Sequence, residues 1–161
     1  MASLDVGCGS RPRGDVNIDI KLSDEWKKYG NRDFIYCDAH YLPLRSNSFD
    51  EAFCFVVLPY VRNEIQVVRE LSRVLKIDGK AVIEHNLLSI YLKDLFKNTR
   101  QPLNIVRRIY LYFFRHNVQN PTINTFQTKR GIVNLLRNNN FSITEVRKIN
   151  NVLHIEAKRR S

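Results

Sequence analysis

Short apolar segments separated by polar turns run through the first half of the chain and predict β-strands. They are found near Leu4 and Asp19, over Asp33–Asp38, over Glu51–Leu58 and over Ala81–His85. The longer ones are rich in β-branched or aromatic residues and are bounded by turn-forming or charged residues. Short, continuous apolar runs of this kind are typical of parallel strands that are buried on both faces.

Two segments have apolar residues at helical spacing. Over Asn63–Lys76 these residues recur every three or four positions, and Asn63 is a suitable N-cap. Lys76 suits the C-terminal end of a helix dipole, and we expect the pair Asp78–Gly79 to stop the helix. A second helix is predicted over Thr128–Asn138.

The end of the chain predicts a hairpin, in which Phe141–Ile149 and Val152–Lys158 are joined by a tight turn at Asn150–Asn151. Residues 87–128 interrupt the earlier rhythm of short strands and predict a helical insertion. The order of elements therefore predicts an α/β fold with a mostly parallel, seven-stranded sheet, closed by an antiparallel C-terminal pair. The length of 161 residues indicates a single domain over 1–161.

The connection between the first two strands carries most of the chemical information. Residues 4–19 read LDVGCGSRPRGDVNID, a short strand, a glycine turn and a second strand that ends on Asp19. The carboxyl ends of neighbouring parallel strands meet at one edge of the sheet, where open α/β sheets bind ligands. Gly7 and Gly9 allow a ligand to approach the main chain closely, and Asp19 can accept hydrogen bonds from two ribose hydroxyls. A nucleoside site is therefore expected at this edge.

Two classes of nucleoside fit that pattern to different degrees. A dinucleotide site uses three glycines and a helix N-terminus that holds the pyrophosphate. Here Pro12 occupies the third glycine position, and the nine residues Gly7–Asp15 are too few for a crossover with a proper helix. S-adenosylmethionine carries no phosphate, and its cationic groups suit Asp5 in the first strand. Arg11 and Arg13 argue against it unless one of them pairs with the methionine carboxylate, but the balance favours S-adenosylmethionine.

The motifs, taken in order, resemble those of the class I S-adenosylmethionine-dependent methyltransferases, which have a Rossmann-like fold. The resemblance covers residues 4–86 well and residues 128–158 weakly. The connection without a helix is similar to a short-loop variant of the family. The segments that carry the resemblance are Leu4–Gly9, Asp19–Ile20, Cys37–Ala39, Phe49–Asp50 with Cys54–Leu58, and Arg69–Lys76 with Gly79.

The resemblance implies a cofactor site built from successive strand ends. Asp19 would bind the ribose, whereas the acid Asp38 and the amide of Ala39 would read the adenine edge. Main-chain carbonyls after the fourth strand would meet the methionine ammonium. The implied cofactor-binding residues are Asp5, Gly7, Cys8, Gly9, Asp19, Ile20, Asp38, Ala39, Phe55 and Val56.

The substrate side matches the family less well. Tyr60 stands where such proteins often carry a histidine, and the helix that usually precedes the first strand is expected to be absent. Tyr60, His85 and Asn86 are weak candidates for contact with the methyl acceptor. We name no catalytic residue, because transfer from a sulfonium relies largely on positioning and needs a base only if the acceptor loses a proton.

The charge is distributed unevenly along the chain. Residues 1–86 hold 12 Lys and Arg against 13 Asp and Glu, and residues 87–161 hold 14 against 3, which gives the net charge of +10. This asymmetry indicates an anionic partner, with nucleic acid favoured over a membrane surface, although a solvated basic face fits equally well. A second copy of the chain is another candidate partner. The alternative function is that of a catalytically inactive, methyltransferase-like binding or partner subunit.

The cysteines and the apolar runs indicate the compartment. Cys8, Cys37 and Cys54 occur singly, without the paired spacing of a zinc site or a disulfide framework, so we expect reduced thiols and no metal. No apolar run is long enough to span a membrane, and the chain enters a strand almost at once. A cytoplasmic protein is therefore expected.

Overall fold

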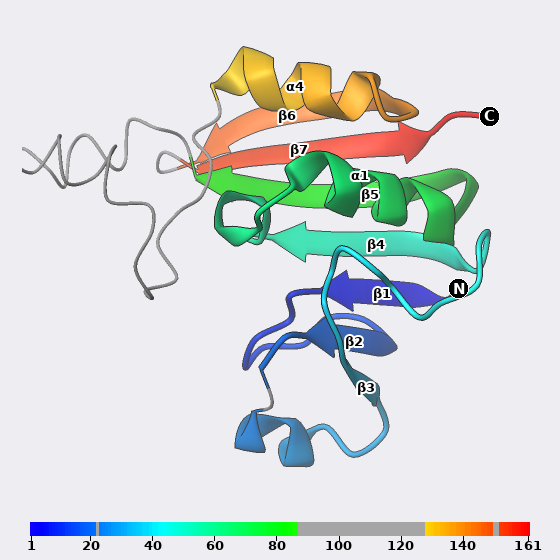
Figure 1. Ribbon diagram of the computed structural model, residues 1–161, viewed down its shortest axis with the longest axis vertical. Helices are drawn as coiled ribbons and strands as arrows, with labels where there is room; N and C mark the ends of the chain where they lie inside the picture. The colour runs from blue at the N-terminus through cyan, green and yellow to red at the C-terminus, as the bar shows by residue number, and fades with distance from the viewer. Residues whose placement is uncertain (22, 87–127, 150–151) are drawn as a thin grey trace, which may run out of the picture.

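The computed structural model describes residues 1–21, 23–86, 128–149 and 152–161, and these residues form one seven-stranded sheet (Figure 1). The strand order is β3-β2-β1-β4-β5-β7-β6. The first five strands are parallel to one another, and β7 runs antiparallel to both β5 and β6. The predicted fold class is confirmed. The strands are β1 (Ser3–Val6), β2 (Val16–Asp19), β3 (Asp33–Tyr36), β4 (Phe49–Phe55), β5 (Leu75–Asn86), β6 (Phe141–Ile149) and β7 (Val152–Arg159).

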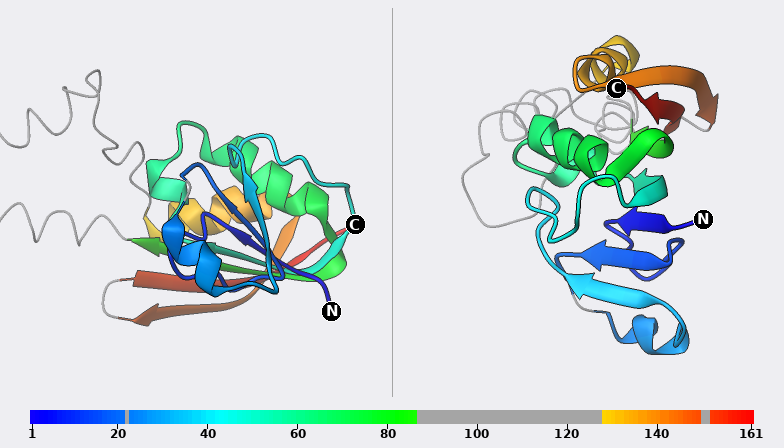
Figure 2. Two further views of the ribbon diagram at one scale, coloured as in Figure 1. Left: turned by 90° about the horizontal axis from the view of Figure 1, so that it is seen from below. Right: turned by 90° about the vertical axis from the view of Figure 1, so that its right-hand side faces the viewer.

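The helices α1 (Glu64–Val74) and α4 (Lys129–Arg137) lie on the same face of the sheet (Figure 2). Each begins at a side-chain cap: Asn63 Oδ1 accepts the N–H of Gln66, as predicted, and Thr128 Oγ1 accepts the N–H of Gly131. Their apolar sides close a core over the central strands. Fully buried members of that core include Leu4, Ala52, Leu71, Ile83, Ile132, Leu136, Phe141 and Ile155.

The expected end of the first helix was wrong. The chain leaves α1 at Val74, and Leu75 already pairs with Phe49 as the first residue of β5. Lys76 therefore does not end the helix but forms an ion pair with Asp50, with 2.7 Å between Lys76 Nζ and Asp50 Oδ1. Strand pairing prevailed here over the helical spacing of the apolar residues.

A short 3-10 helix, η1 (Asp24–Lys28), follows β2, where no helix was predicted. Its residues have no apolar periodicity, because Trp26 is the buried residue among them. The fourth strand was expected to continue to Leu58, but β4 ends at Phe55. Leu58 instead begins a second 3-10 turn, η2 (Leu58–Tyr60).

Two predictions fall on residues that the structure leaves undescribed. The predicted helical insertion over 87–128 lies outside the described residues, apart from Thr128, and so does the Asn150–Asn151 turn. The strands that flank this turn pair from Ile149 opposite Val152 to Phe141 opposite Arg159. Among the described helices, none is both long and apolar enough to cross a membrane.

A charged clamp ties the loop after β3 to α1. Arg73 Nε and Nη2 donate to the carboxylate of Glu70, each over 2.8 Å. The same guanidinium donates to the carbonyl oxygens of Leu44 and Leu42 over 2.7 and 2.9 Å. Glu70 Oε2 also accepts the N–H of Leu42 over 2.7 Å. The hydrogen bonds from Arg73 hold the pKa of Glu70 below its usual value despite partial burial.

Replacing Arg73 with Ala should lower the free energy of unfolding by about 2–3 kcal/mol, because the buried carboxylate of Glu70 loses its charged partner and two carbonyls lose their donor. Urea denaturation measures this difference. The pKa of Glu70 is depressed in the folded state, so its stabilisation is present above about pH 4.5 and is lost as the pH falls. The gap between wild type and variant should therefore narrow in acid.

The control is Lys28→Ala, which removes an exposed pair with Glu25 and should cost about 0.5 kcal/mol or less. Equal losses in the two variants, or a gap for Arg73→Ala that does not change with pH, would contradict the clamp.

Candidate functional site

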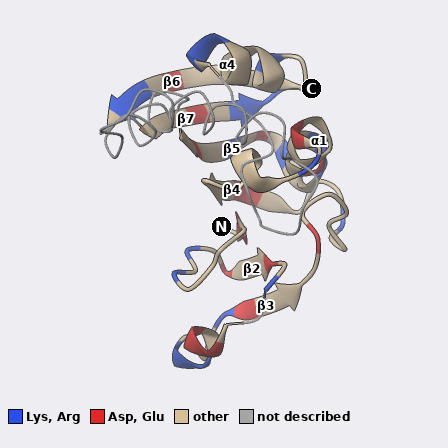
Figure 3. Cartoon of the chain, turned by 60° about the vertical axis from the view of Figure 1, so that its left-hand side comes forward, with Lys and Arg blue, Asp and Glu red and all other residues tan. Residues whose placement is uncertain are grey.

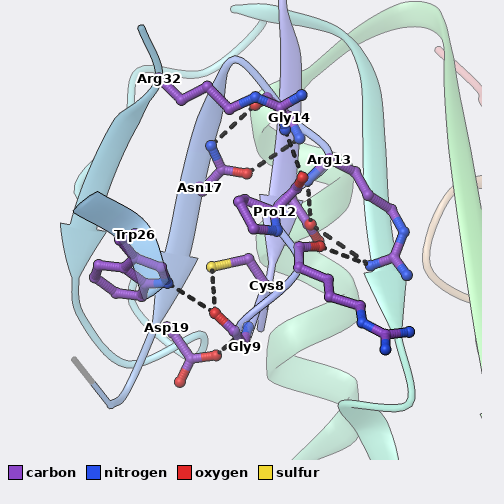
Figure 4. A network of polar contacts seen from close by, with 11 residues as sticks. Cys8, Gly9, Pro12, Arg13, Gly14, Asn17, Asp19, Trp26 and Arg32 are labelled. Carbon is purple, nitrogen blue, oxygen red and sulfur yellow. Dashed lines mark hydrogen bonds and ion pairs between the residues drawn. The ribbon is translucent and has the colours of Figure 1, made fainter. Parts of the chain in front are cut away.

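The carboxyl ends of β1 to β4 meet at one edge of the sheet, and the β1–β2 loop, residues 7–15, folds over it (Figure 4). Gly7 and Gly9 have positive φ angles of 73° and 53°. A Cβ on Gly7 would lie 2.2 Å from Val57 Cγ2, so only glycine permits this packing. A Cβ on Gly9 would meet nothing within 4 Å. The main chain at Gly9 therefore faces open space, as a ligand-binding turn requires.

Asp5 is fully buried beneath this loop. Its Oδ2 accepts the N–H of Arg13 over 2.9 Å, and Arg13 Nη1 lies 3.9 Å from the same oxygen. Within the described part of the chain, Asp5 Oδ1 is buried and has no hydrogen-bond partner. Burial raises the pKa of Asp5 to about 6, against the lowering effect of the Arg13 hydrogen bond and charge. The loop thus covers an acid that keeps one unsatisfied oxygen.

The guanidinium of Arg13 stacks on a residue at the end of β4, with its Cζ 4.3 Å from the centroid of the Phe55 ring. Such cation–π contacts stabilise an arginine in place. The next residue, Val56, has a φ angle of 58° and donates its N–H to Glu84 O over 2.9 Å. A positive φ is unusual for a β-branched residue, and strain of this kind concentrates at functional turns. The strained turn leads directly to Val57, which packs against Gly7.

Asp19 ends β2 and holds the same loop from the other side. Its Oδ2 accepts the N–H of Gly9 over 2.8 Å, and its Oδ1 accepts the N–H of Lys21 over 2.9 Å. Each carboxylate oxygen can accept a second hydrogen bond. Ile20, the next residue, exposes 59% of its surface. Asp19 is therefore oriented by the backbone with acceptor capacity to spare.

Trp26 is a part of this site that the sequence did not reveal. Its Nε1 donates to Gly9 O over 2.7 Å (Figure 4). Its ring stacks on Phe34 with 4.8 Å between centroids. Arg32 supports the loop similarly by donating from Nη1 to Pro12 O over 2.5 Å. A lone tryptophan in a polar segment was the available signal, but its partner lies 17 residues away.

Asp38 lies two residues beyond β3, in an exposed loop rather than in the expected strand. Cys37 donates its N–H to Asp19 O over 3.1 Å, which keeps this loop beside the end of β2. The carboxylate of Asp38 contacts His40. Desolvation raises the pKa of Asp38, but hydrogen bonds from His40 outweigh it and leave the pKa below its usual value. Asp38 is thus ionised at neutral pH, and Ala39 beside it is half-buried.

The fold that carries this site is similar to those of known proteins. A family model described as a methyltransferase domain matches residues 15–83. A S-adenosylmethionine-dependent methyltransferase from Methanosarcina mazei superposes with a TM-score of 0.71 at 19% identity, covering 98% of this chain and 92% of that one. The PH0226 protein from Pyrococcus horikoshii gives a TM-score of 0.74 at 21% identity, covering 99% and 81%.

This chain has the fold of the class I S-adenosylmethionine-dependent methyltransferases. The resemblance predicted from the motifs is confirmed at this level, and the cofactor that a methyltransferase domain of this fold implies is S-adenosylmethionine.

The relatives found by sequence carry no assigned activity. Two uncharacterized proteins of Methanocaldococcus jannaschii are 29% identical over 103 residues and 28% identical over 114 residues. These alignments cover 59% and 63% of this chain but 40% and 50% of the relatives. The chain therefore spans half or less of the length of the curated relatives it matches.

The residues at the sheet edge of this methyltransferase fold suit the implied cofactor. The open main chain at Gly9 permits close approach, Asp19 has free acceptor capacity for a ribose, and the orphaned Oδ1 of Asp5 is a buried anionic acceptor. Cys8 lines the same turn, where burial raises the pKa of its thiol to about 12. Its thiol therefore stays protonated and does not serve as a nucleophile.

The substrate-side candidates of the methyltransferase fold lie in different environments. Tyr60 is on η2 with 45% of its surface exposed. His85, inside β5, is fully buried, and its ring Nδ1 lies 2.8 Å from Asn86 O. Burial lowers the pKa of His85, so the ring is neutral at pH 7. The assignment of these three residues to the acceptor remains a prediction.

Replacing Asp5 with Asn should change how stability depends on pH. The pKa of Asp5 is raised to about 6 in the fold, so its favourable contribution is present below pH 3.8 and is lost as the pH rises through about 6. Asn retains an oxygen for the Arg13 N–H and does not ionise. The stability of the variant relative to wild type should therefore rise by up to about 3 kcal/mol between pH 4 and pH 7.5.

Urea unfolding at several pH values measures this relative stability. Asp24→Asn, on a side chain that is 93% exposed, serves as the control and should show no such trend. A difference between Asp5→Asn and wild type that stays constant with pH would show that Asp5 ionises normally.

Proposed function

We propose that this chain is a S-adenosylmethionine-dependent methyltransferase that acts on nucleic acid. The observation that carries the first part is the arrangement at the ends of β1 to β3, where Asp5 and Asp19 bind the glycine-containing loop and Asp38 follows β3 in the loop beside the end of β2. We also propose that residues 1–161 form one methyltransferase domain, which spans half or less of the length of the curated relatives. Unpaired cysteines at positions 8, 37 and 54 support the cytoplasmic location that we propose for it.

In this proposal each strand end holds a different part of the cofactor. Asp19 accepts hydrogen bonds from the ribose hydroxyls, with Ile20 against the adenine and Asp38 and the Ala39 amide at its edge. Asp5, Gly7, Cys8 and Gly9 line the methionine end together with the main chain at Phe55 and Val56. Arg13, which already lies over Phe55, is placed to pair with the methionine carboxylate.

When bound, S-adenosylmethionine supplies an electrophilic methyl group on a positively charged sulfur. The leaving thioether is neutral, so no acid is required, and the residues of this chain contribute mainly by orientation. A base is needed only for an acceptor that loses a proton. His85 is neutral but fully buried, and Tyr60 and Asn86 are the other acceptor-side candidates, so we assign no catalytic residue.

The basic C-terminal part supports nucleic acid as the acceptor. Residues 128–161 contain eight Lys and Arg but only two Glu. Because β7 runs antiparallel to both β5 and β6, the end of β6 lies at the same edge of the sheet as the end of β5 and the cofactor candidates, with β7 between β5 and β6. Lys129, Arg130, Arg147 and Lys148 occupy that end, and Figure 3 shows Lys and Arg on α4 and toward the end of β6. Phosphates held there would lie at the same edge of the sheet as the methyl donor, with β4, β5 and β7 between them.

A second candidate function is that of a methyltransferase-like partner subunit. It is favoured by one observation, the full burial of Asp5 beneath Arg13, which covers the expected methionine end. A structural neighbour with a TM-score of 0.72 at 13% identity is a putative methyltransferase of Haloferax volcanii in complex with the Trm112 methyltransferase activator. Assembly with such a protein, or with a second copy of this chain, is compatible with an active methyltransferase and with an inactive partner subunit.

Calorimetric titration with S-adenosylhomocysteine should give micromolar binding that depends on Asp19. Replacing Asp19 with Ala removes two hydrogen bonds to a charged acceptor and should weaken binding by about 30-fold or more. Asp24→Ala is the matched control, because it removes a nearby exposed carboxylate and should leave the affinity unchanged. Absence of wild-type binding at millimolar ligand would favour the partner subunit, and transfer of a labelled methyl group to RNA would exclude it.

Affinity for a fluorescent single-stranded RNA should fall with salt, with a logarithmic slope of about −0.7 for each phosphate neutralised. Replacing Lys148 with Gln should reduce the magnitude of that slope by about 0.7. Lys158→Gln is the matched control, since Lys158 is exposed on the neighbouring strand at the opposite end of the sheet.

A flat response to salt, or equal effects of the two substitutions, would remove the nucleic-acid proposal. Binding to anionic phospholipid vesicles in place of RNA would favour a membrane surface instead.

A further inference from the structure

His40 contacts two different segments through the two nitrogens of its ring. Its Nδ1 lies 2.5 Å from Asp38 Oδ1, and its Nε2 lies 3.1 Å from the backbone nitrogen of Asn63. The His40 side chain is 12% exposed, whereas that of Asp38 is 48% exposed. The ring therefore bridges the loop after β3 to the residue that caps α1.

The chemistry of the two partners determines which ring nitrogen carries the proton. The backbone N–H of Asn63 is a donor, so Nε2 must accept and carries no hydrogen. Nδ1 then carries the proton and donates it to the carboxylate of Asp38. The backbone N–H of His40 donates to the same Asp38 oxygen over 2.9 Å. One oxygen of Asp38 is thus held by two donors from a single residue.

The loop is secured to α1 by more than the ring. Gln66 Nε2 donates to the carbonyl oxygen of His40 over 3.2 Å, and the backbone N–H of Gln66 donates to Asn63 Oδ1. His40 therefore joins the first turn of α1 with both its backbone and its side chain. Within the described residues, the other oxygen of Asp38, Oδ2, takes part in no hydrogen bond.

We infer that His40 is a positioning residue that fixes Asp38 so that Oδ2 is held toward the cofactor's base and selects adenine. The inference rests on the proposed function, in which Asp38 reads the adenine edge. An immobilised carboxylate accepts the 6-amino group of adenine, and it repels a base with an oxygen at that position. Without the His40 ring, the carboxylate keeps only the backbone donor of residue 40 and is held less firmly, and the cationic Arg62 acts on the same carboxylate. Selectivity between the bases would then fall, because a mobile acceptor can turn away from the unfavourable oxygen.

The test compares affinities for S-adenosylhomocysteine and S-inosylhomocysteine by calorimetry. Wild type should prefer the adenosyl ligand by at least about 30-fold. His40→Phe keeps a ring of similar shape and loses both hydrogen bonds. It should weaken adenosyl binding by about 10-fold and leave inosyl binding nearly unchanged, so the preference collapses. His40→Gln offers one donor and one acceptor and should restore part of the preference.

Two further variants make the result specific. Asp38→Asn can donate an N–H to the 6-oxygen and should remove or reverse the preference, whereas Tyr41→Phe, in the same loop, should preserve it. If wild type prefers the adenosyl ligand and His40→Phe retains that preference, the inference fails and the proposed function stands. Equal weakening of both ligands in His40→Phe and His40→Gln would show a purely structural role and would also overturn it. If wild type binds neither ligand, the proposed function fails and the inference with it.

Discussion

The short β1–β2 loop is the constraint on which the rest of the site depends. It returns the chain from β1 to its neighbour β2 without a helix, and side chains fix it instead. Asn17 accepts the N–H of Gly14 over 3.1 Å and donates to the Gly14 carbonyl over 2.9 Å, while Trp26 holds the carbonyl of Gly9. Because the loop itself contains no helix, a ligand here would have to be recognised by carboxylates and by open main chain. That requirement favours a cationic ligand over a pyrophosphate.

The loop also imposes a cost on the fold. It covers Asp5, and burial of a carboxylate disfavours its ionised form, which is why the pKa of Asp5 rises to about 6. A leucine or asparagine at this position would avoid that penalty, so stability alone does not account for an acid there. The positive φ of Val56, whose neighbour Val57 packs on Gly7, is likewise not explained by stability alone. Both features are typical of a site that is organised for binding rather than for stability.

Long, regular patterns in the sequence were sufficient for most of the fold. The apolar run of β4, the spacing of α1 and the antiparallel pair of terminal strands were predicted correctly, because each is decided by many residues at once. The end of α1 was predicted wrongly, because an apolar residue such as Leu75 fits the helical spacing as well as it fits the strand in which it pairs with Phe49. The glycine turn and the strand-end acids could be recognised, but contacts such as that of Trp26 with Gly9 join residues distant in sequence. His40 was visible beside Asp38, yet its partner Asn63 could be found only in the structure.

The distribution of charge along the site edge joins the two parts of the proposed function. The ends of β1 to β3 carry carboxylates, whereas the end of β6 and the start of α4 carry Lys and Arg at the same edge of the sheet. A cationic cofactor would be drawn to the first region and a polyanionic acceptor to the second. Since the strand order separates these regions by β4, β5 and β7, an acceptor held by the Lys and Arg would have to extend across the ends of these strands to reach the methyl donor. Tyr60, His85 and Asn86 all lie there, which makes this boundary the place where acceptor specificity would be decided.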